Sequence, residues 1–208
     1  MTHMSVDPVV LAASIVIKLQ TTVSRETKPG EFAVMTVGAL NAGSKSNIIP
    51  DRAVLLLNIH SYDNQLRTRV LAAIERIVTG ECAAAGSPRG PEFEFYDQFP
   101  LTNNDAKATD RVTAAFTRHF GAAAVEQASR QTASEDFSRI PDAFGVPYTY
   151  WLLGGCEPEA YRAAEARGTV AQDIPANHSP YLAPVLDPTL SMGVQAHVVA
   201  ALAYLGAT

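Results

Sequence analysis

The sequence predicts an α/β chain in which a small α+β sandwich precedes a second segment of helices and short strands. Three observations predict this: the order of elements up to residue 98, a change in composition near Pro100, and helical apolar spacing on both sides of that change. The first part follows the order helix, strand, strand, helix, strand, which is one opening strand short of a βαββαβ unit. The 208 residues, of which 47% are hydrophobic, suffice for one large domain or two small ones.

The sandwich begins with a helix. Asp7 and Pro8 predict its start, because aspartate caps helices and proline is tolerated in the first turn. Apolar residues at helical spacing then occupy two sides, which predicts that both sides are covered. A strand is expected at 32–40, followed by a loop at 41–51. The apolar residues are Val9, Ala12, Val16 and Leu19 on one side and Val10, Ala13 and Ile17 on the other.

The strand expected at 53–61 is the clearest element, because two sets of side chains alternate along it. One face is wholly apolar, and the other ends in polar residues, so Asn58 and His60 should point the same way. A long helix at 64–86 follows, with apolar residues at alternating spacings of three and four. A short strand at 92–96 is expected to close the unit.

The second part, from about residue 99, is expected to alternate helices and short strands. Its expected elements are a helix at 105–120, a strand at 124–128, a short helix after the polar loop at 132–138, an aromatic-rich strand at 146–153 and a last helix at 187–205. The segment at 156–175 has weak periodicity and is expected to be loop with a helical turn. A long loop beside polar residues is more often functional than idle.

The charge balance narrows the classes of partner. Lysine and arginine number 16 against 21 aspartate and glutamate residues, a net charge of −5 without a dense basic run. This argues against nucleic acid and against an anionic membrane as partners. No apolar stretch is long enough for a membrane span, and the first residues do not resemble a secretion signal. With only two cysteines, a reducing cytoplasm is the expected compartment.

Two loops carry the candidate functional residues. His178 lies between Pro175 and Pro180, which limit local freedom, so it is either a catalytic or metal-binding residue or a surface histidine in a turn. Glu135 and Asp136 can both face one site at a helix start, or they can be ordinary helix N-terminal charge. A metal centre needs three or four ligands at defined spacing, and HExxH, HxH and paired CxxC are all absent.

Five segments occur in fixed order along nearly the whole chain: VDPVVLAASIVIKLQTTVSRE, VGALNAGSKSNIIPDRAVLLLNI, ASEDFSRI, VPYTYWLLGG and IPANHSPYLAP. Together they resemble the M20 peptidase family. The nearest branch looks like the amidohydrolases that include hippurate hydrolases and hydrolases of indole-acetyl amino acids.

This resemblance implies a two-domain, metal-dependent hydrolase. An α/β metallopeptidase catalytic domain holds two divalent metal ions, zinc, manganese or similar, and a ferredoxin-like α+β lid domain inserted into it commonly dimerises. Residues 1–98 would be a nearly complete lid or dimerisation domain, and residues 99–208 the C-terminal half of the catalytic domain. The reaction would be hydrolysis of the amide bond of an N-acyl amino acid or small peptide, at a water activated by the metals.

The resemblance also implies roles for individual residues. His178 matches the family's last metal ligand, in its H-S-P segment. Asn47 matches an asparagine that reaches from the lid to the substrate, and Gly154 and Gly155 match a backbone turn near the substrate pocket. The acidic pair in ASEDFSRI matches a segment that borders the site.

Two departures from the family pattern stand out. The family usually has an arginine at the end of the N-x-R strand, where it grips a substrate carboxylate through a fork of hydrogen bonds. His60 stands there, 13 residues after Asn47, as either a substrate-binding residue with altered recognition or a drifted position. The remaining metal ligands, the glutamate base and the opening lid strand have no counterpart, so we expect a fragment, a truncated reading frame or an expressed piece that is inactive alone.

Three functional hypotheses follow. The first hypothesis is that the chain is part of an M20 amidohydrolase that forms a homodimer through its lid. The second is a non-catalytic dimerisation or binding module, favoured by the apolar helix and by a sheet left with an edge. The third, a separate hydrolase with its own complete site, is the least favoured.

Overall fold

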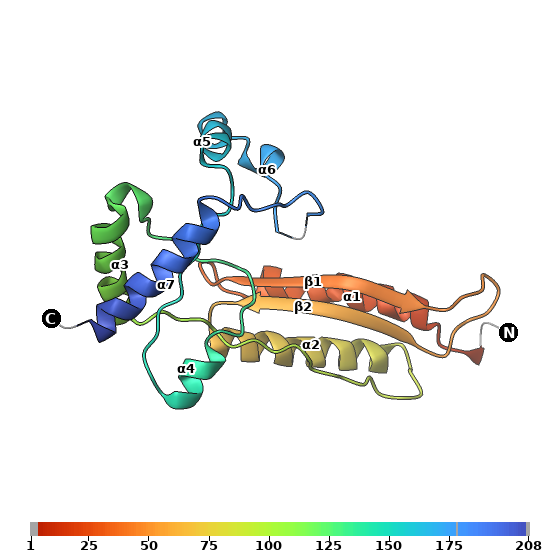
Figure 1. The fold of residues 1–208 in the computed structure, drawn as a ribbon. Coiled ribbons are helices and arrows are strands. Elements are labelled where there is room, and N and C mark those ends of the chain that lie inside the picture. Colours follow the sequence, from red (N-terminus) through yellow and green to blue (C-terminus); the bar gives the residue numbers. More distant parts are fainter. Residues whose placement is uncertain (1–3, 178, 207–208) are drawn as a thin grey trace. The chain divides into compact units, whose positions relative to one another are not determined.

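A computed structural model describes residues 4–177 and 179–206 and divides the chain into two compact units. Unit 1 comprises Met1–Leu101 with Thr132–Glu135, and unit 2 comprises Thr102–Gln131 with Asp136–Thr208. Figure 1 labels the elements of both units.

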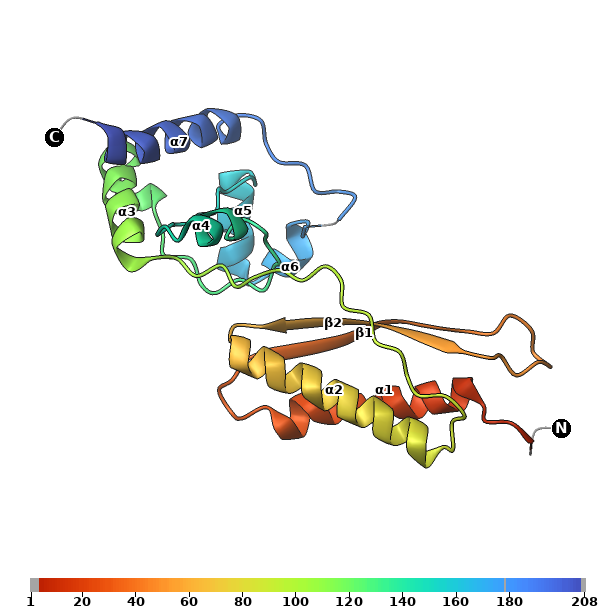
Figure 2. The same cartoon turned by 90° about the horizontal axis from the view of Figure 1, so that it is seen from below.

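Unit 1 consists of two helices and a two-stranded antiparallel sheet. Its elements are α1 (Pro8–Glu26), β1 (Ala33–Ala42), β2 (Ala53–Ser61) and α2 (Asn64–Ala84). Figure 2 shows that both helices cover the same face of the sheet. The expected helix, strand, strand, helix order is therefore confirmed, and the clearest expected strand has the predicted bounds.

Both helices of unit 1 begin at aspartate side chains. The carboxylate of Asp7 accepts a hydrogen bond from the backbone N–H of Val9 at 2.9 Å, and that of Asp63 accepts one from Leu66 at 2.7 Å. Each bond satisfies an N–H group that the helix itself cannot pair. The helix start predicted at Asp7 and Pro8 is therefore correct.

The core of unit 1 lies between the helices and the sheet. Its buried members are Ile15, Leu19, Met35, Leu66, Val70, Ile74, Ile77 and Cys82. The apolar face of β2 packs against this core, whereas Asn58 on the opposite face is exposed, as the alternation predicts. Burying a side chain the size of leucine contributes about 1.5–3 kcal/mol. The core therefore fixes which face of β2 points outward.

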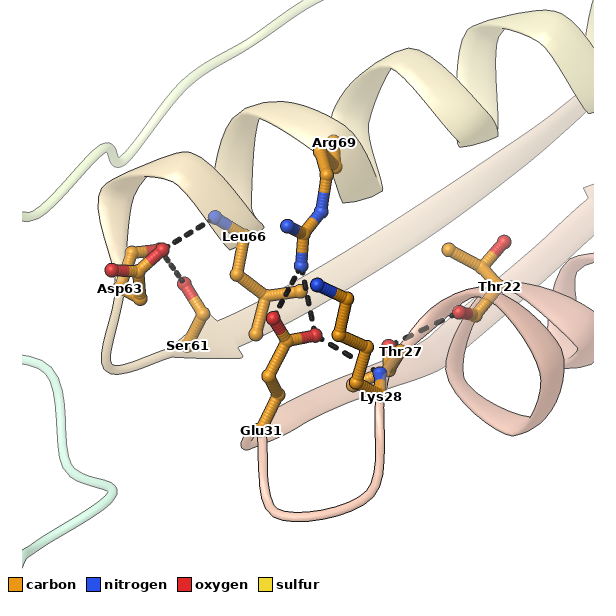
Figure 3. A network of polar contacts seen from close by, with 8 residues as sticks. All are labelled: Thr22, Thr27, Lys28, Glu31, Ser61, Asp63, Leu66 and Arg69. Carbon is orange, nitrogen blue, oxygen red and sulfur yellow. Dashed lines mark hydrogen bonds and ion pairs between the residues drawn. The ribbon is translucent and has the colours of Figure 1, made fainter.

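The loop between α1 and β1 is held by polar contacts (Figure 3). The Thr27 hydroxyl donates to the carbonyl of Thr22 at 3.2 Å, just beyond the end of α1. The carboxylate of Glu31 accepts hydrogen bonds from the Arg69 guanidinium at 2.7 Å and from the backbone N–H of Lys28 at 2.9 Å. These contacts connect the start of β1 to α2.

Helix α1 buries only one of its two apolar sides within the chain. Ile15 and Leu19 are buried, whereas Val10 and Ile17 are 66% and 73% exposed. The prediction that α1 is covered on both sides is therefore wrong for the single chain. The second side, which we call the outer face of α1, is an unpartnered apolar surface in the described residues.

The strand predicted at 92–96 is absent, since these residues are irregular and the described sheet of unit 1 contains β1 and β2 alone. In a ferredoxin-like sheet, the opening strand lies between two others. One of them corresponds to β2 here, and the other is the last strand, which was expected at 92–96. Without such a strand in the described chain, residues 92–96 have no neighbour with which to form a ladder. The physical reason for the error is that a strand requires a partner.

Unit 2 is built from helices, without a strand in the part of it that the structure describes. Its elements are α3 (Ala106–Phe120), the 3₁₀ helix η2 (Ala122–Ala124), α4 (Arg139–Phe144), α5 (Pro158–Arg167), α6 (Val170–Asp173) and α7 (Thr189–Leu205). Helices α3 and α7 pack together. The Arg111 Nε–H donates to the carbonyl of Ala203 at 2.7 Å, and a hydrogen bond of 2.9 Å joins His119 Nε2 to Gln195 Oε1.

The strands predicted at 124–128 and 146–153 are also absent. In the second segment the backbone of Tyr150 pairs with a side chain instead: Asn104 donates to the carbonyl of Tyr150 at 2.8 Å and accepts from its N–H at 2.7 Å. The carbonyl of Tyr148 accepts one hydrogen bond from the backbone N–H of Asp105 at 2.8 Å. The amide of Asn104 thus takes the hydrogen bonds that a neighbouring strand would supply. The sequence pattern is that of a strand, but no ladder exists for it to join.

The segment at 156–175 is more helical than predicted, because it contains both α5 and α6. The Glu157 carboxylate caps α5 through the N–H of Ala160 at 2.7 Å, and the helix ends at Gly168, whose φ of 69° suits glycine. Only Ala164 of α5 is buried, which explains the weak apolar periodicity.

No helix in residues 4–177 and 179–206 is long and apolar enough to cross a membrane.

Candidate functional site

The two candidates in unit 1 lie toward opposite ends of β2. Asn47 is exposed in the loop that precedes Ala53, whereas His60 is the next-to-last residue of the strand and pairs with Val34. At about 3.3 Å per residue, the strand from Ala53 to His60 spans roughly 23 Å. The structure therefore does not bring Asn47 and His60 together within one copy of unit 1.

His60 shares the outward sheet face with Asn58, as the sequence predicts, and its side chain is half-buried. A neutral imidazole has one donor and one acceptor nitrogen, and cannot offer the paired donors of a guanidinium. In this position it can make one hydrogen bond to a carboxylate oxygen. Its role toward a substrate stays a prediction.

The acidic pair lies close to a helix start. The backbone carbonyl of Asp136 accepts a hydrogen bond from the N–H of Arg139, the first residue of α4, at 3.0 Å. Glu135 is half-buried and Asp136 is exposed. This placement agrees with both alternatives left open by the sequence, a pair facing a site and simple N-terminal charge.

Sequence reasoning did not single out Ser138, which directly precedes α4. Its side chain is fully buried, and its hydroxyl has no hydrogen-bond partner among the described residues. Buried hydroxyl groups are normally paired, so this one is unusual in the segment that carries the acidic pair. The burial of Ser138 is the property that sets it apart. Nothing in the sequence predicts that one serine of a polar loop is buried.

The two glycines differ in their surroundings. A Cβ placed on Gly154 would have no neighbour within 4 Å, whereas one on Gly155 would lie 3.3 Å from Pro184 Cβ. The carbonyl of Gly155 also accepts a hydrogen bond from the N–H of Val185 at 2.9 Å. Gly155 is therefore the position where the backbone comes close to residues 184–185, and the substrate-pocket role of both glycines stays a prediction.

His178 lies outside the described residues. Among the residues that follow it, the N–H of Leu182 donates to the carbonyl of Ser179 at 3.1 Å, so residues 179–182 form a turn. Within residues 4–177 and 179–206, no group of three or more His, Cys, Asp or Glu side chains could hold a metal ion. The described side chains alone therefore do not complete the metal site that the resemblance implies.

A feature that sequence reasoning missed is a hollow of about 430 Å³ in the loop between β1 and β2. Its lining includes the cations Lys45 and Arg52, the carboxylate of Asp51 and the apolar side chains of Ile48 and Val54. The sequence predicts a polar loop for this segment, but nothing in it predicts that the loop forms a hollow. We call this feature the loop hollow.

Comparison with known proteins places part of the chain in a described family. Residues 1–85 match the family described as "Peptidase dimerisation domain" (M20_dimer). The chain is 32% identical over 146 residues to the N-acetyl-L-cysteine deacetylase of Bacillus subtilis (strain 168), covering 68% of this chain and 34% of that protein. It is 32% identical over 134 residues to the hippurate hydrolase of Campylobacter jejuni, covering 63% of this chain and 34% of that protein.

A solved structure resembles nearly all of the chain. It is the Bacillus subtilis YXEP protein, described as a dinuclear metal binding peptidase from the M20 family, with a TM-score of 0.66. The match covers 98% of this chain and 46% of that chain at 21% identity, and at this identity the likeness concerns the fold. This chain spans about a third of the two relatives' length and less than half of the solved chain.

Proposed function

Because this chain belongs to the M20 peptidase family, we propose that it forms part of a metal-dependent amidohydrolase that acts on N-acyl amino acids or small peptides. The observation that carries the proposal is the 32% identity to two hydrolases whose names specify N-acetyl-L-cysteine and hippurate. Both compounds are amino acids with an acyl group on nitrogen, so cleavage of the amide bond is the chemistry they share.

We propose residues 1–98 as the lid or dimerisation domain and residues 99–208 as part of the catalytic domain. The match of residues 1–85 to a dimerisation family supports the first assignment. The fold likeness over 98% of the chain supports the second, since it extends through the helices of unit 2.

The proposed site residues come from both of the proposed domains. Asn47 and His60 would bind the substrate, and His178 would be a metal ligand. Gly154 and Gly155 would lie near the substrate, with the acidic pair at the border of the site. Bound divalent metals would polarise the amide carbonyl and lower the pKa of a water molecule. The described residues alone do not complete a site for these ions.

The test compares two proteins for release of free amino acid from N-acetyl-L-cysteine and from hippurate, with zinc or manganese added. The first is the 208-residue chain, which we expect to be inactive. The second is the same chain extended by any in-frame coding sequence found upstream, which we expect to be active and to lose activity with a chelator. Turnover by the first protein would refute the proposed inactivity, and failure of the second on both substrates would refute the proposed substrate class.

The role of His178 can be tested in the active form. His178→Ala should abolish metal-dependent turnover, whereas His119→Ala serves as the matched control, because His119 lies on α3 and its ring bonds to Gln195. Equal activity of the two variants would contradict the proposed ligand role.

The alternative function is a non-catalytic dimerisation or binding module. The observation that favours it is the outer face of α1, with Val10 and Ile17 exposed in a region that matches a dimerisation family. An extended protein that assembles into dimers but hydrolyses neither substrate would favour this alternative.

A further inference from the structure

A groove of about 350 Å³ lies between α1 and α2, the two helices of unit 1, which pack against each other. Its α2 side consists of residues that share one helix face, at spacings of three and four: Arg69, Ala72, Ala73 and Arg76. The two alanines between the two arginines leave the space that longer side chains would fill. We call this feature the interhelix groove, and its lining includes none of the proposed substrate or metal-binding residues.

A buried hydroxyl group belongs to the α1 side of the groove. Thr22 lines the groove and is fully buried, and its hydroxyl has no hydrogen-bond partner among the described residues. Figure 3 shows this hydroxyl pointing away from Thr27, whose own hydroxyl donates to the Thr22 carbonyl. Buried hydroxyl groups are normally paired, so an acceptor atom of a bound ligand would satisfy this one.

Two guanidinium groups of the lining have donors to spare. Arg69 binds Glu31 and Arg76 binds Glu26 at 2.7 Å, and each arginine donates to both carboxylate oxygens through Nη2 alone. The Nη1 and Nε groups of both arginines have no partner among the described residues, so neither guanidinium uses the fork of two nitrogens that it can offer. The two side chains are 47% and 61% exposed, which leaves them free to turn toward a ligand.

The charge and size of the groove restrict its ligand. Glu26 is the carboxylate of the lining, so the two arginines leave one excess positive charge, which favours an anion. Val70 and the two alanines supply an apolar surface beside these charges. Since a water molecule occupies about 30 Å³ of the liquid, the groove has room for an organic group as well as an anionic one.

We propose that the interhelix groove binds a small phosphomonoester. A phosphoryl group presents three acceptor oxygens, and the groove offers three donor groups: the Thr22 hydroxyl and the guanidinium groups of Arg69 and Arg76. A carboxylate has only two oxygens and would leave one of these donor groups unmatched. The organic part of the ester would lie over Ala72. The proposal involves neither metal nor hydrolysis, so it is independent of the proposed function.

The test uses phenyl phosphate as the probe. It is titrated into the ¹⁵N-labelled 208-residue chain, and the amide shifts of the nuclear magnetic resonance spectrum give the dissociation constant and the location of binding. We expect saturable shifts on both sides of the groove. Benzoate, which carries a carboxylate on the same ring, and inorganic phosphate, which lacks the ring, should both bind more weakly.

Substitutions on α2 test the two arginines and the space between them. Arg69→Gln and Arg76→Gln should each weaken binding by about threefold to tenfold, as expected for one charge-assisted contact in an open site. The matched control is Arg118→Gln, which removes an exposed arginine of α3 in unit 2. Ala72→Leu should abolish measurable binding by filling the groove, whereas Ala83→Leu, also exposed on α2, should not. Both alanines are replaced by another good helix former.

Thr22→Val tests the buried hydroxyl separately from folding. It should weaken binding by about threefold to tenfold without lowering stability, because it removes a hydroxyl that is unpaired in the free protein. Thr21→Val is the control and should leave the dissociation constant unchanged. The proposal is overturned if phenyl phosphate does not bind, if benzoate or inorganic phosphate binds equally well, or if the groove variants behave like their controls. Because only binding is measured, a failure here is distinct from a failure of the proposed hydrolysis.

Discussion

The hydroxyl group of Thr22 shows how a single polar group can lower the free energy of unfolding. The side chain is fully buried on α1, and its hydroxyl has no hydrogen-bond partner among the described residues. Valine has the same shape without the hydroxyl, so Thr22→Val should raise the free energy of unfolding by about 1 kcal/mol, the lower end of the cost of an unpaired buried group. Urea denaturation followed by circular dichroism measures the change.

The neighbouring threonine supplies the control. The hydroxyl of Thr21 donates to the carbonyl of Lys18 at 2.7 Å, so Thr21→Val removes a hydrogen bond and should not stabilise the protein. An equal gain in both variants would mean that β-branched apolar substitution, rather than the unpaired hydroxyl, causes the effect.

We expect the stability of unit 1 to depend on pH through the carboxyl group of Glu31. The hydrogen bonds from Arg69 and from the backbone of Lys28 hold the pKa of the Glu31 carboxyl below its ordinary value of 4.5. A carboxyl whose pKa is lower in the folded state contributes stability that is complete above its ordinary pKa and is lost as the pH falls below it. Glu31→Gln should therefore reduce the loss of stability between neutral pH and the region below pH 4.5.

Denaturation curves at several pH values test this expectation. Glu75→Gln is the matched control, because Glu75 is exposed on α2 and has no hydrogen-bond or ion-pair partner in the described chain. If both variants change the pH dependence equally, the contacts of Glu31 are not the cause.

Single residues also show what sequence can reveal. The aspartate caps and the two faces of β2 are predictable, because they depend on local chemistry and on alternation along the chain. The unpaired hydroxyl groups of Thr22 and Ser138 are not, since no local pattern of the sequence marks the burial of these two side chains. The loop hollow is hidden for the same reason: its lining is contiguous, but its shape depends on how the loop folds.

At the scale of elements, helix α1 depends on the side that faces the core. Leu19 is fully buried there, so Leu19→Ala should lower the free energy of unfolding by about 2–5 kcal/mol through lost burial and the cavity left behind. The adjacent Lys18 is exposed, and Lys18→Ala should change stability by less than about 0.5 kcal/mol. Urea denaturation distinguishes the two, and similar losses would contradict the assigned orientation of α1.

Helices and strands differed in how well they could be predicted. A helix satisfies its backbone within its own segment, so α1, α2 and α3 were predictable from caps and spacing. Helix α7 was also expected, but it begins at Thr189 instead of residue 187 and has no side-chain cap. A strand needs a neighbour, and the segments at 92–96 and 146–153 have strand-like sequences but no partner strand in the described chain. The errors therefore concern pairing, which is information that lies outside each segment.

At the scale of the molecule, the family could be predicted because five motifs occur in a fixed order, and the matches to known proteins agree with that prediction. The site residues could not be tested in the same way. Asn47 and His60 lie toward opposite ends of β2, and His178 lies outside the described residues. A site that draws on distant segments cannot be assembled from spacing alone.

The outer face of α1 leads to the last prediction, which concerns assembly. Val10 and Ile17 expose apolar surface within the region that matches a dimerisation family, and covering such surface is favourable. We expect the 208-residue chain to be a dimer at micromolar concentration, and Ile17→Lys to convert it to a monomer, because the interface would then bury an unpaired charge. Light scattering coupled to size-exclusion chromatography measures both masses.

The control for this prediction is Phe144→Lys, which places the same charge on an apolar side chain that is 77% exposed on α4 of unit 2. It should leave the dimer intact, because the proposed interface belongs to unit 1. A monomeric unsubstituted chain would contradict assembly through α1, and so would a dimer that Phe144→Lys disrupts and Ile17→Lys does not. If instead the predicted pattern is observed, the apolar side of α1 that remains exposed in the single chain is the surface that a second copy covers.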